Sequence, residues 1–264
     1  NETLQVAQEV AGFDVIFYGH DHQLFRQTIT NTEGNQVLLL NPSSNGRFIA
    51  EVTVRSGHIK GRLINIEHEP VSQSFINRFT PEFEEVRNFV NRKIATFHTP
   101  IRTHDCYFGN SAFCDLIHDL QLRITKADIS FNAPLSYDTS IEVGDVHVSD
   151  MFNLYAYENQ IYVLQLTGYE IHRYLEMSYD LWVHTMQRPE DPLMRIIPSE
   201  SHIQPQQWRF ANLAFNFDSA CGIDYEVDVR QPYGHKVHIL GMTDGHPFHE
   251  DRIYKVAMNS YRGN

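Results

Sequence analysis

Short apolar runs separated by polar turns dominate residues 1–66, a pattern typical of strands and hairpins. After a short amphipathic helix, residues 14–18 form a β-branched and aromatic run that ends at Gly19. Turn-forming residues then separate four further apolar runs, so this segment predicts one buried strand followed by two β-hairpins. The hairpin strands are expected at residues 28–30, 36–40, 48–54 and 59–66.

Residues 67–100 begin as a polar connection and then change to helical spacing. Thr80 fits an N-cap and Pro81 fits the first helical position. The apolar residues that follow form one stripe of a helix that ends near Ala95. We therefore predict a helix over residues 80–95 that links two units.

From residue 101 onward some segments have the apolar spacing of helices and others have that of strands. This mixture predicts a second unit built from helices and strands. Helices are expected over residues 111–122, 149–155 (capped by Ser149 or Asp150) and 168–181. Strands are expected at residues 127–131, 160–166, 212–217, 224–229, 236–240 and 254–258, with an irregular Pro-rich stretch over 186–207. The fold class predicted for the whole chain is therefore mixed, α+β or α/β.

Composition restricts the possible binding partners more than it restricts the fold. Of the 264 residues 42% are apolar, enough for a substantial core, and 33 acidic against 21 basic residues give a net charge of −12. This balance argues against a nucleic-acid polymer as the main partner, because phosphate backbones are bound by clustered Lys and Arg. A small phosphorylated ligand stays compatible, since a metal ion can supply positive charge locally. No apolar run approaches the ~20 residues of a membrane helix.

The segment Gly19-His20-Asp21-His22 is the first candidate for chemistry. It follows the predicted strand, so two imidazoles are expected in a tight turn at a strand end. Neutral imidazole is a good ligand for Zn, Mn, Fe or Ni. The chain holds 15 histidines, so a pair two residues apart also arises without any function, and the local pattern leaves both interpretations open.

These motifs resemble a known family. Gly-His-x-His after a strand, followed by residues 41–47, resembles the closing motif of the calcineurin-like metallophosphoesterases. Leu166-Thr167-Gly168, Phe131-Asn132 and Met258 to Tyr261 resemble the C-terminal domain of the 5′-nucleotidase family. The resemblance implies a fragment truncated at both ends. Its implied parts are the C-terminal edge of a four-layer αββα metallophosphoesterase domain at 1–66, a linker with a helix at 67–100, and a mixed α/β substrate-binding domain at 101–264.

The resemblance implies a centre of two divalent metal ions, Zn, Mn or similar, that hydrolyses phosphate esters. His20 and His22 would each ligate a metal, and Asp21 would not. The other ligands and the catalytic histidine of the family lie upstream of this chain. The chain is therefore expected to hold no catalytic residue of its own and to be inactive alone.

The resemblance also implies a clamp in which two aromatic rings sandwich a nucleobase. Tyr157 and Tyr261 align with those rings, although aromatic residues also pack ordinary cores. Asn159 and Gly222 align with positions that hydrogen-bond the base or ribose, and the alternative is that they are turn residues. Asn132 aligns with the first residue of the family's Asn-Gly-Gly-Gly-Ile-Arg loop.

The chain departs from the family at two segments. Residues 132–137 lack the glycines and the arginine of that loop, and residues 107–111 lack a second arginine.

The expected function is a phosphoric ester hydrolase of 5′-nucleotidase or cyclic-nucleotide phosphodiesterase type, which binds a small-molecule phosphate ester such as a nucleotide. The alternative is a non-catalytic nucleotidase-like module with an altered ligand pocket. Export to a periplasm or cell surface is implied by resemblance. Arg262 and the histidines outside the motif are expected at the surface, among them His58, His68, His98, His104, His118 and His147.

Overall fold

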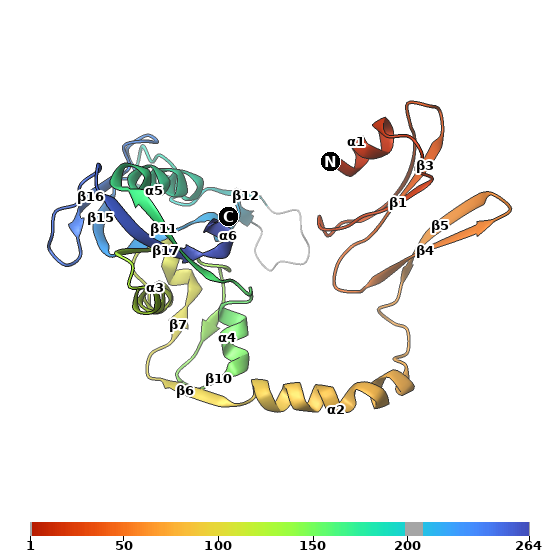
Figure 1. Cartoon of the computed structure of the whole chain (residues 1–264), viewed down its shortest axis with the longest axis horizontal. Coiled ribbons are helices and arrows are strands. Elements are labelled where there is room, and N and C mark those ends of the chain that lie inside the picture. Colours follow the sequence, from red (N-terminus) through yellow and green to blue (C-terminus); the bar gives the residue numbers. More distant parts are fainter. Residues whose placement is uncertain (1, 199–207, 264) are drawn as a thin grey trace. The chain divides into compact units, whose positions relative to one another are not determined.

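A computed structural model describes residues 2–198 and 208–263 of the chain. The chain divides into two compact units, Asn1–Glu82 and Phe83–Asn264, and the division falls within the long helix α2 (Gln73–Val90). Figure 1 gives the order of the elements along the chain. Each unit is described by itself.

The first unit is a small sheet with a helix and a hairpin. Its elements are α1 (Glu2–Glu9), β1 (Val15–Phe17), β2 (Leu24–Thr30), β3 (Gln36–Pro42), β4 (Phe48–Arg55) and β5 (His58–Asn65). Strand β3 is central, parallel to β1 and antiparallel to β2, while β4 and β5 pair with each other. The two predicted hairpins are therefore confirmed. A core of Ala7, Ile29, Val37 and Leu39 holds α1 against the sheet.

The second unit contains most of the regular structure. Its elements are β6 (Lys93–Phe97), β7 (Ile101–Arg102), the 3₁₀ turn η1 (Thr103–Tyr107), α3 (Ala112–Thr125), β8 (Ile129–Asn132), β9 (Ser140–Ile141), β10 (Gly144–His147), α4 (Val148–Leu154), β11 (Ile161–Thr167), α5 (Gly168–Trp182), β12 (Ile196–Pro198), β13 (Trp208–Phe210), the 3₁₀ turn η2 (Ala214–Asn216), β14 (Ser219–Cys221), β15 (Ile223–Val227), β16 (Val237–Met242), β17 (Ile253–Asn259) and α6 (Ser260–Gly263).

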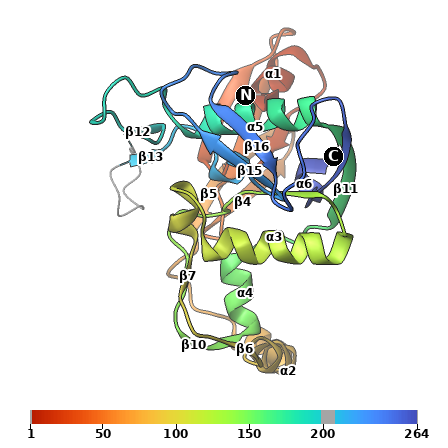
Figure 2. The same ribbon diagram turned by 90° about the vertical axis from the view of Figure 1, so that its left-hand side faces the viewer.

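A four-stranded sheet in the order β11-β17-β8-β14 organises this unit. Strands β17 and β8 run parallel, and the other two pairs are antiparallel. Helices α3 and α5 lie on opposite sides of the sheet (Figures 1 and 2). Buried Ile129, Phe131, Ile171, Leu175 and Val256 fill the core. The unit is thus a mixed α/β domain, as predicted.

The predicted linker helix is wrong at both ends. Helix α2 begins at Gln73, ahead of Thr80, and the Thr80 hydroxyl donates to the Ile76 carbonyl at 2.7 Å instead of capping a new helix. Pro81 lies inside the helix, where a proline removes one backbone hydrogen bond. Residues 93–97 leave the helical pattern because they pair with β10 as strand β6.

Three further predictions need correction or comment. Residues 214–216 form the 3₁₀ turn η2 where a strand was expected, and strand β14 follows it. Helix α4 begins at Val148, and Asp150 lies in its first turn and accepts from the His147 N–H at 2.6 Å rather than occupying the N-cap. Part of the stretch expected to be irregular, 199–207, lies outside the described residues.

Candidate functional site

Several candidate residues meet at one edge of the four-stranded sheet. Asn132 ends β8 and Asn259 ends β17, and these strands are parallel, so both residues lie at the same carboxyl edge. The first residue of β11, Ile161, pairs with Asn259. The loop before β11 and helix α6 after β17 are therefore brought to this edge, which we call the β8–β17 edge. Carboxyl edges of parallel strands are common positions for ligand sites.

A hydrogen-bonded network fixes Asn159 at this edge. The Tyr155 hydroxyl accepts from the Asn159 amide at 3.3 Å and from the Asn259 amide at 3.2 Å. The Ser260 hydroxyl donates to the Asn159 side-chain oxygen at 3.2 Å. These bonds tie the loop before β11 to the start of α6, so Asn159 is held in place rather than left as a free turn residue.

Tyr157 and Tyr261 are exposed aromatic residues of the same edge. Tyr157 lies in the loop between α4 and β11, and Tyr261 lies in α6. Each side chain is 58% exposed, which excludes the alternative that they pack a core. The Tyr261 ring meets Phe215 edge-to-face at 5.5 Å between centroids, so one side of the ring is supported by a neighbour.

Arg262 and Asp218 form a buried ion pair behind Tyr261 that the sequence did not reveal. The Arg262 Nε lies 2.8 Å from the Asp218 Oδ2, and the two side chains are only 17% and 2% exposed. The same guanidinium donates to the Phe215 carbonyl and to the Asn216 side-chain oxygen. The expectation of a solvated Arg262 is therefore wrong. The pair anchors α6 to η2 and so positions Tyr261.

Asn132 is buried without hydrogen-bond partners. It is 1% exposed, and neither its amide nitrogen nor its side-chain oxygen has a partner among the described residues. An unpaired buried amide costs a few kcal/mol, so such a group in a native protein is usually satisfied by water or a ligand. Asn132 therefore fits a residue whose partner comes from outside the chain.

Gly222 does not join the other candidates. It directly follows Cys221, the last residue of β14, whereas Ser219 begins that strand. Gly222 therefore lies beside the start of β8. Its φ is +95°, and a Cβ there would lie 2.2 Å from the Asp128 carbonyl. Glycine is required at this position by backbone packing, which supplies a structural reason for the residue away from the β8–β17 edge.

His20 and His22 lie in the loop after β1 in the first unit. Both are exposed and both have positive φ, 74° and 58°. Asp21 accepts from the buried Asn41 amide at 2.5 Å, and the Ser43 hydroxyl donates to the His22 carbonyl at 2.9 Å. Backbone strain of this kind costs about 1–3 kcal/mol per residue and clusters at functional sites. The segment 41–43 thus holds the loop in a left-handed conformation.

The donor chemistry of this loop fits a metal such as Zn or Mn, because two imidazole side chains are open to solvent. Across residues 2–198 and 208–263, however, no group of three or more His, Cys, Asp or Glu side chains is placed to hold an ion. A metal centre at this loop would therefore need further ligands besides His20 and His22.

The remaining histidines are mostly at the surface, with one clear exception. His118 on α3 is 3% exposed and hydrogen-bonds to Ser130 at 2.9 Å, so its predicted surface position is wrong. It lies on a helix face with Cys114 and Gln121, away from the stripe of Leu116 and Leu120, so the apolar spacing of the sequence did not reveal its burial. None of the described helices combines the length and apolar character needed to cross a bilayer.

The sheet and its two covering helices define a mixed α/β domain with a polar β8–β17 edge. The profile of the family described as 5′-nucleotidase, C-terminal domain, matches residues 93–264. The chain belongs to the 5′-nucleotidase family through this domain.

Individual relatives agree with this assignment. The trifunctional nucleotide phosphoesterase protein YfkN of Bacillus subtilis (strain 168) is 21% identical over 315 residues, which covers 99% of this chain and 20% of that protein. A putative 5′-nucleotidase from Staphylococcus aureus, solved with alpha-ketoglutarate, has a TM-score of 0.67 at 17% identity and matches 95% of this chain and 47% of its own. A 5′-nucleotidase precursor from Thermus thermophilus has a TM-score of 0.51 at 21% identity, over 100% of this chain and 52% of its own.

The two structural matches establish a shared fold. The chain spans about a fifth of the length of YfkN and about half the length of the two solved proteins. The relatives carry the names of 5′-nucleotidases and nucleotide phosphoesterases, which are hydrolases.

Proposed function

We propose that this chain is the base-binding part of a metal-dependent phosphoester hydrolase that acts on nucleotides, of 5′-nucleotidase or cyclic-nucleotide phosphodiesterase type. The observation that carries the proposal is the β8–β17 edge. There the pairing of β11 with β17 brings the loop of Tyr157 and helix α6 with Tyr261, both exposed tyrosines, to the same end of the sheet.

The edge suits the organic part of a nucleotide. Stacking a base on an aromatic ring contributes about 1–3 kcal/mol per base, and both tyrosine rings are open to solvent. Asn159 and the unpartnered Asn132 supply amide donors and acceptors for the base or ribose. Arg262 is already engaged by Asp218. The edge therefore favours a neutral moiety, and the phosphate is expected to bind outside it.

His20 and His22 would hold the metal ions on the side of this chain. Two divalent ions supply an activated water and stabilise charge on a phosphoryl group. The chain's own contribution is to present both imidazoles outward on a loop fixed by the Asn41–Asp21 and Ser43–His22 hydrogen bonds. The remaining ligands and the catalytic histidine are assigned to polypeptide that this chain does not include.

Domain organisation and location follow the same proposal. Residues 1–66 would complete a metallophosphoesterase domain, 67–100 would link the domains, and 101–264 would bind substrate. The Thermus thermophilus protein is named a precursor, and this name supports a periplasmic or extracellular location.

A binding module without turnover is the second candidate. It is favoured by the segment 132–137, which lacks the glycines and arginine of the family loop, and by the incomplete ligand set among the described residues. The two candidates differ in whether bound nucleotide is hydrolysed.

The test is phosphate release by the longest natural polypeptide that contains this chain, with Mn²⁺ or Zn²⁺ and a panel of nucleoside monophosphates and cyclic nucleotides. His20→Ala and His22→Ala should each lower kcat/KM by about a hundredfold or more. His58→Ala is the matched control, since His58 is an exposed histidine of the same unit outside the loop. Hydrolysis that is equal in all three variants overturns the metal assignment. Nucleotide binding without any phosphate release supports the binding module.

A further inference from the structure

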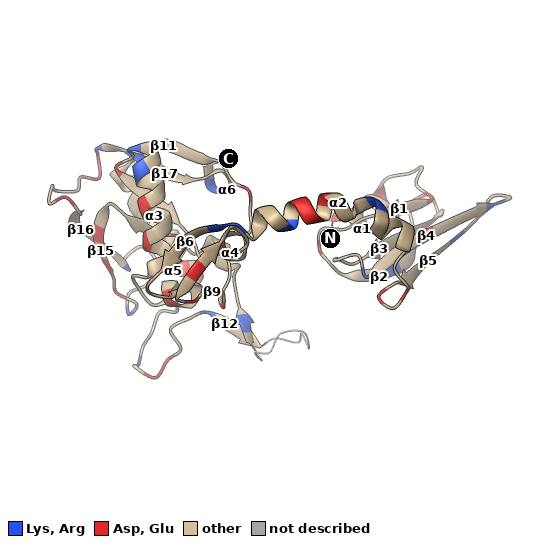
Figure 3. Cartoon of the chain, turned by 90° about the horizontal axis from the view of Figure 1, so that it is seen from below, with Lys and Arg blue, Asp and Glu red and all other residues tan. Residues whose placement is uncertain are grey.

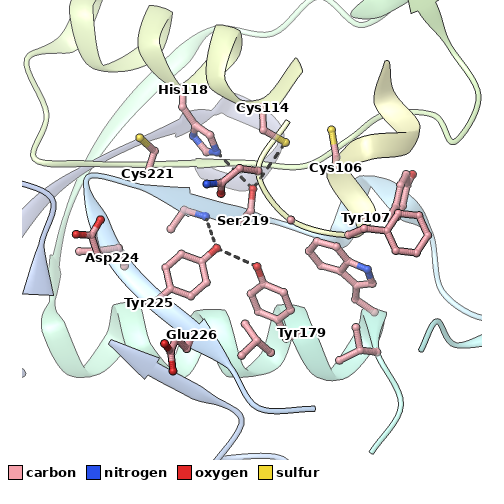
Figure 4. Close-up of a pocket in the computed structure, with 18 of the residues that line it drawn as sticks. Cys106, Tyr107, Cys114, His118, Tyr179, Ser219, Cys221, Asp224, Tyr225 and Glu226 are labelled. Atoms are coloured by element: carbon pink, nitrogen blue, oxygen red, sulfur yellow. Dashed lines mark hydrogen bonds between the residues drawn. The ribbon is translucent and has the colours of Figure 1, made fainter. Parts of the chain in front are cut away.

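A separate cavity of about 680 Å³ lies beside β14, one of the two edge strands of the sheet. Residues of α3, α5, β14 and β15 line it (Figure 4). Its volume falls in the range of about 300–1,000 Å³ that is typical of small-molecule sites. Tyr157, Tyr261, Asn159 and Asn132 are not among its lining residues, so it is distinct from the β8–β17 edge.

Rigid aromatic side chains form one wall of the cavity. Tyr107, Tyr179 and Trp182 are all less than a tenth exposed. Tyr179 and Trp182 stack with ring centroids 4.8 Å apart, and Trp182 meets Tyr107 edge-to-face at 6.1 Å. A ligand that contacts this wall meets rings that are already fixed by packing, which lowers the entropy lost on binding.

The polar groups inside the cavity are uncharged. The Tyr179 and Tyr225 hydroxyls hydrogen-bond to each other at 2.9 Å, and Tyr225 accepts from the Ala220 N–H at 3.1 Å (Figure 4). Ser219 lies 3.4 Å from the His118 Nε2. Burial lowers the pKa of His118 to about 4, so its imidazole is neutral at pH 7. These groups offer hydrogen bonds without supplying positive charge.

The charge around the cavity is negative. Asp115, Asp224 and Glu226 are exposed carboxylates that line it, and its lining contains no lysine or arginine in the part of the chain that the structure describes. Figure 3 shows acidic positions on α3 and β15. Burial is the main cause that raises the pKa of the Cys221 thiol, and the nearby carboxylates of Asp115, Asp119 and Asp224 add a smaller increase in the same direction.

We propose that this cavity binds a small organic cation, an amine with an aromatic or extended apolar body. The body would pack against Tyr107 and Trp182, and the ammonium group would lie at the rim beside Asp224 and Glu226. The carboxylates of Asp115, Asp224 and Glu226 repel ligands that carry a phosphate or carboxylate group. The cavity therefore selects against the anionic substrates proposed for the protein.

Calorimetric titration of the 264-residue chain with tryptamine and with indole-3-propionate tests the proposal. The two probes share the indole ring and differ in the sign of their charge. Tryptamine should bind saturably, and at least about tenfold more tightly than the anion. The double variant Asp224→Asn with Glu226→Gln should weaken tryptamine binding roughly four- to twentyfold. Asp251→Asn, a change at an exposed acid outside the cavity, is the matched control.

Four results would overturn this proposal. One is no tryptamine binding, a second is equal binding of the two probes, and the third is an equal loss of affinity in the double variant and in Asp251→Asn. Competition by adenosine would also count against it, because the cavity would then belong to the nucleotide site. A failure to detect phosphoester hydrolysis leaves the amine result unaffected, so the two proposals fail separately.

Discussion

His118 is the residue whose chemistry is changed most plainly by its position. It was expected at the surface, but it lies on the buried face of α3 with hydrogen bonds to Ser130 and Ser219. Burial lowers its pKa from the ordinary 6.5 to about 4. The folded protein therefore keeps this imidazole neutral at pH values where an exposed histidine is already charged.

The stability of the second unit should consequently fall in acid. As pH drops below 6.5 the unfolded chain takes up a proton at His118 before the folded chain does. The stabilisation is complete above pH 6.5, is lost as pH falls towards 4, and amounts to about 3 kcal/mol. Urea unfolding at pH 7.5 and 4.5, followed by the fluorescence of Trp182 and Trp208, measures this difference. His118→Gln should show a smaller acid loss, and an identical loss in both proteins would refute the assignment.

Arg262 and Asp218 give the second prediction at the residue scale. Removing one partner of a buried ion pair strands the other charge and costs about 3–5 kcal/mol. Arg262→Met should therefore destabilise the second unit by that amount, because Asp218 is 2% exposed. The double variant Arg262→Met with Asp218→Asn removes both charges and should recover part of the loss. Urea unfolding midpoints compare the wild-type protein with the two variants. An Arg262→Met variant as stable as the wild type would contradict the buried ion pair.

Among the elements, α5 shows how local sequence sets a boundary. Thr167 accepts from the Glu170 N–H at 3.2 Å, and Glu170 accepts from the Thr167 N–H at 2.8 Å, which is a capping box. Thr167→Ala should cost about 1 kcal/mol, whereas Thr167→Ser retains the hydroxyl and should cost only a few tenths. Thermal unfolding checks the pair, and equal midpoints for the two variants would show that the cap contributes nothing.

The elements that sequence predicted well are those specified by nearby residues. The hairpin strands β2 to β5 and helices α3 and α5 follow clear periods with turn or cap residues at their ends. Helix α2 was misplaced because Pro81 usually marks a helix start, yet Phe75 and Phe79 continue the apolar stripe ahead of it. Strands as short as β14 have too few residues to show a period, and they exist because a distant strand pairs with them.

For the molecule as a whole, pairings between distant strands decide the candidate site. The β11–β17 pairing unites Asn159 with Tyr261, and the parallel β8–β17 pairing adds Asn132. Motif resemblance pointed to these residues but not to their supports, since the Arg262–Asp218 pair and Phe215 match no motif. Gly222 was grouped with them by alignment alone, and its backbone contact with Asp128 places it at the other end of β14.

The most direct test of the β8–β17 edge is calorimetric titration of the 264-residue chain with adenosine. We expect saturable binding that Tyr157→Ala and Tyr261→Ala each weaken roughly 5- to 150-fold, the loss of one stacked ring. Tyr233→Ala, at a tyrosine that is 48% exposed elsewhere in the same unit, should leave the affinity unchanged. Absence of adenosine binding, or an equal loss at Tyr233, would show that this edge does not bind a base.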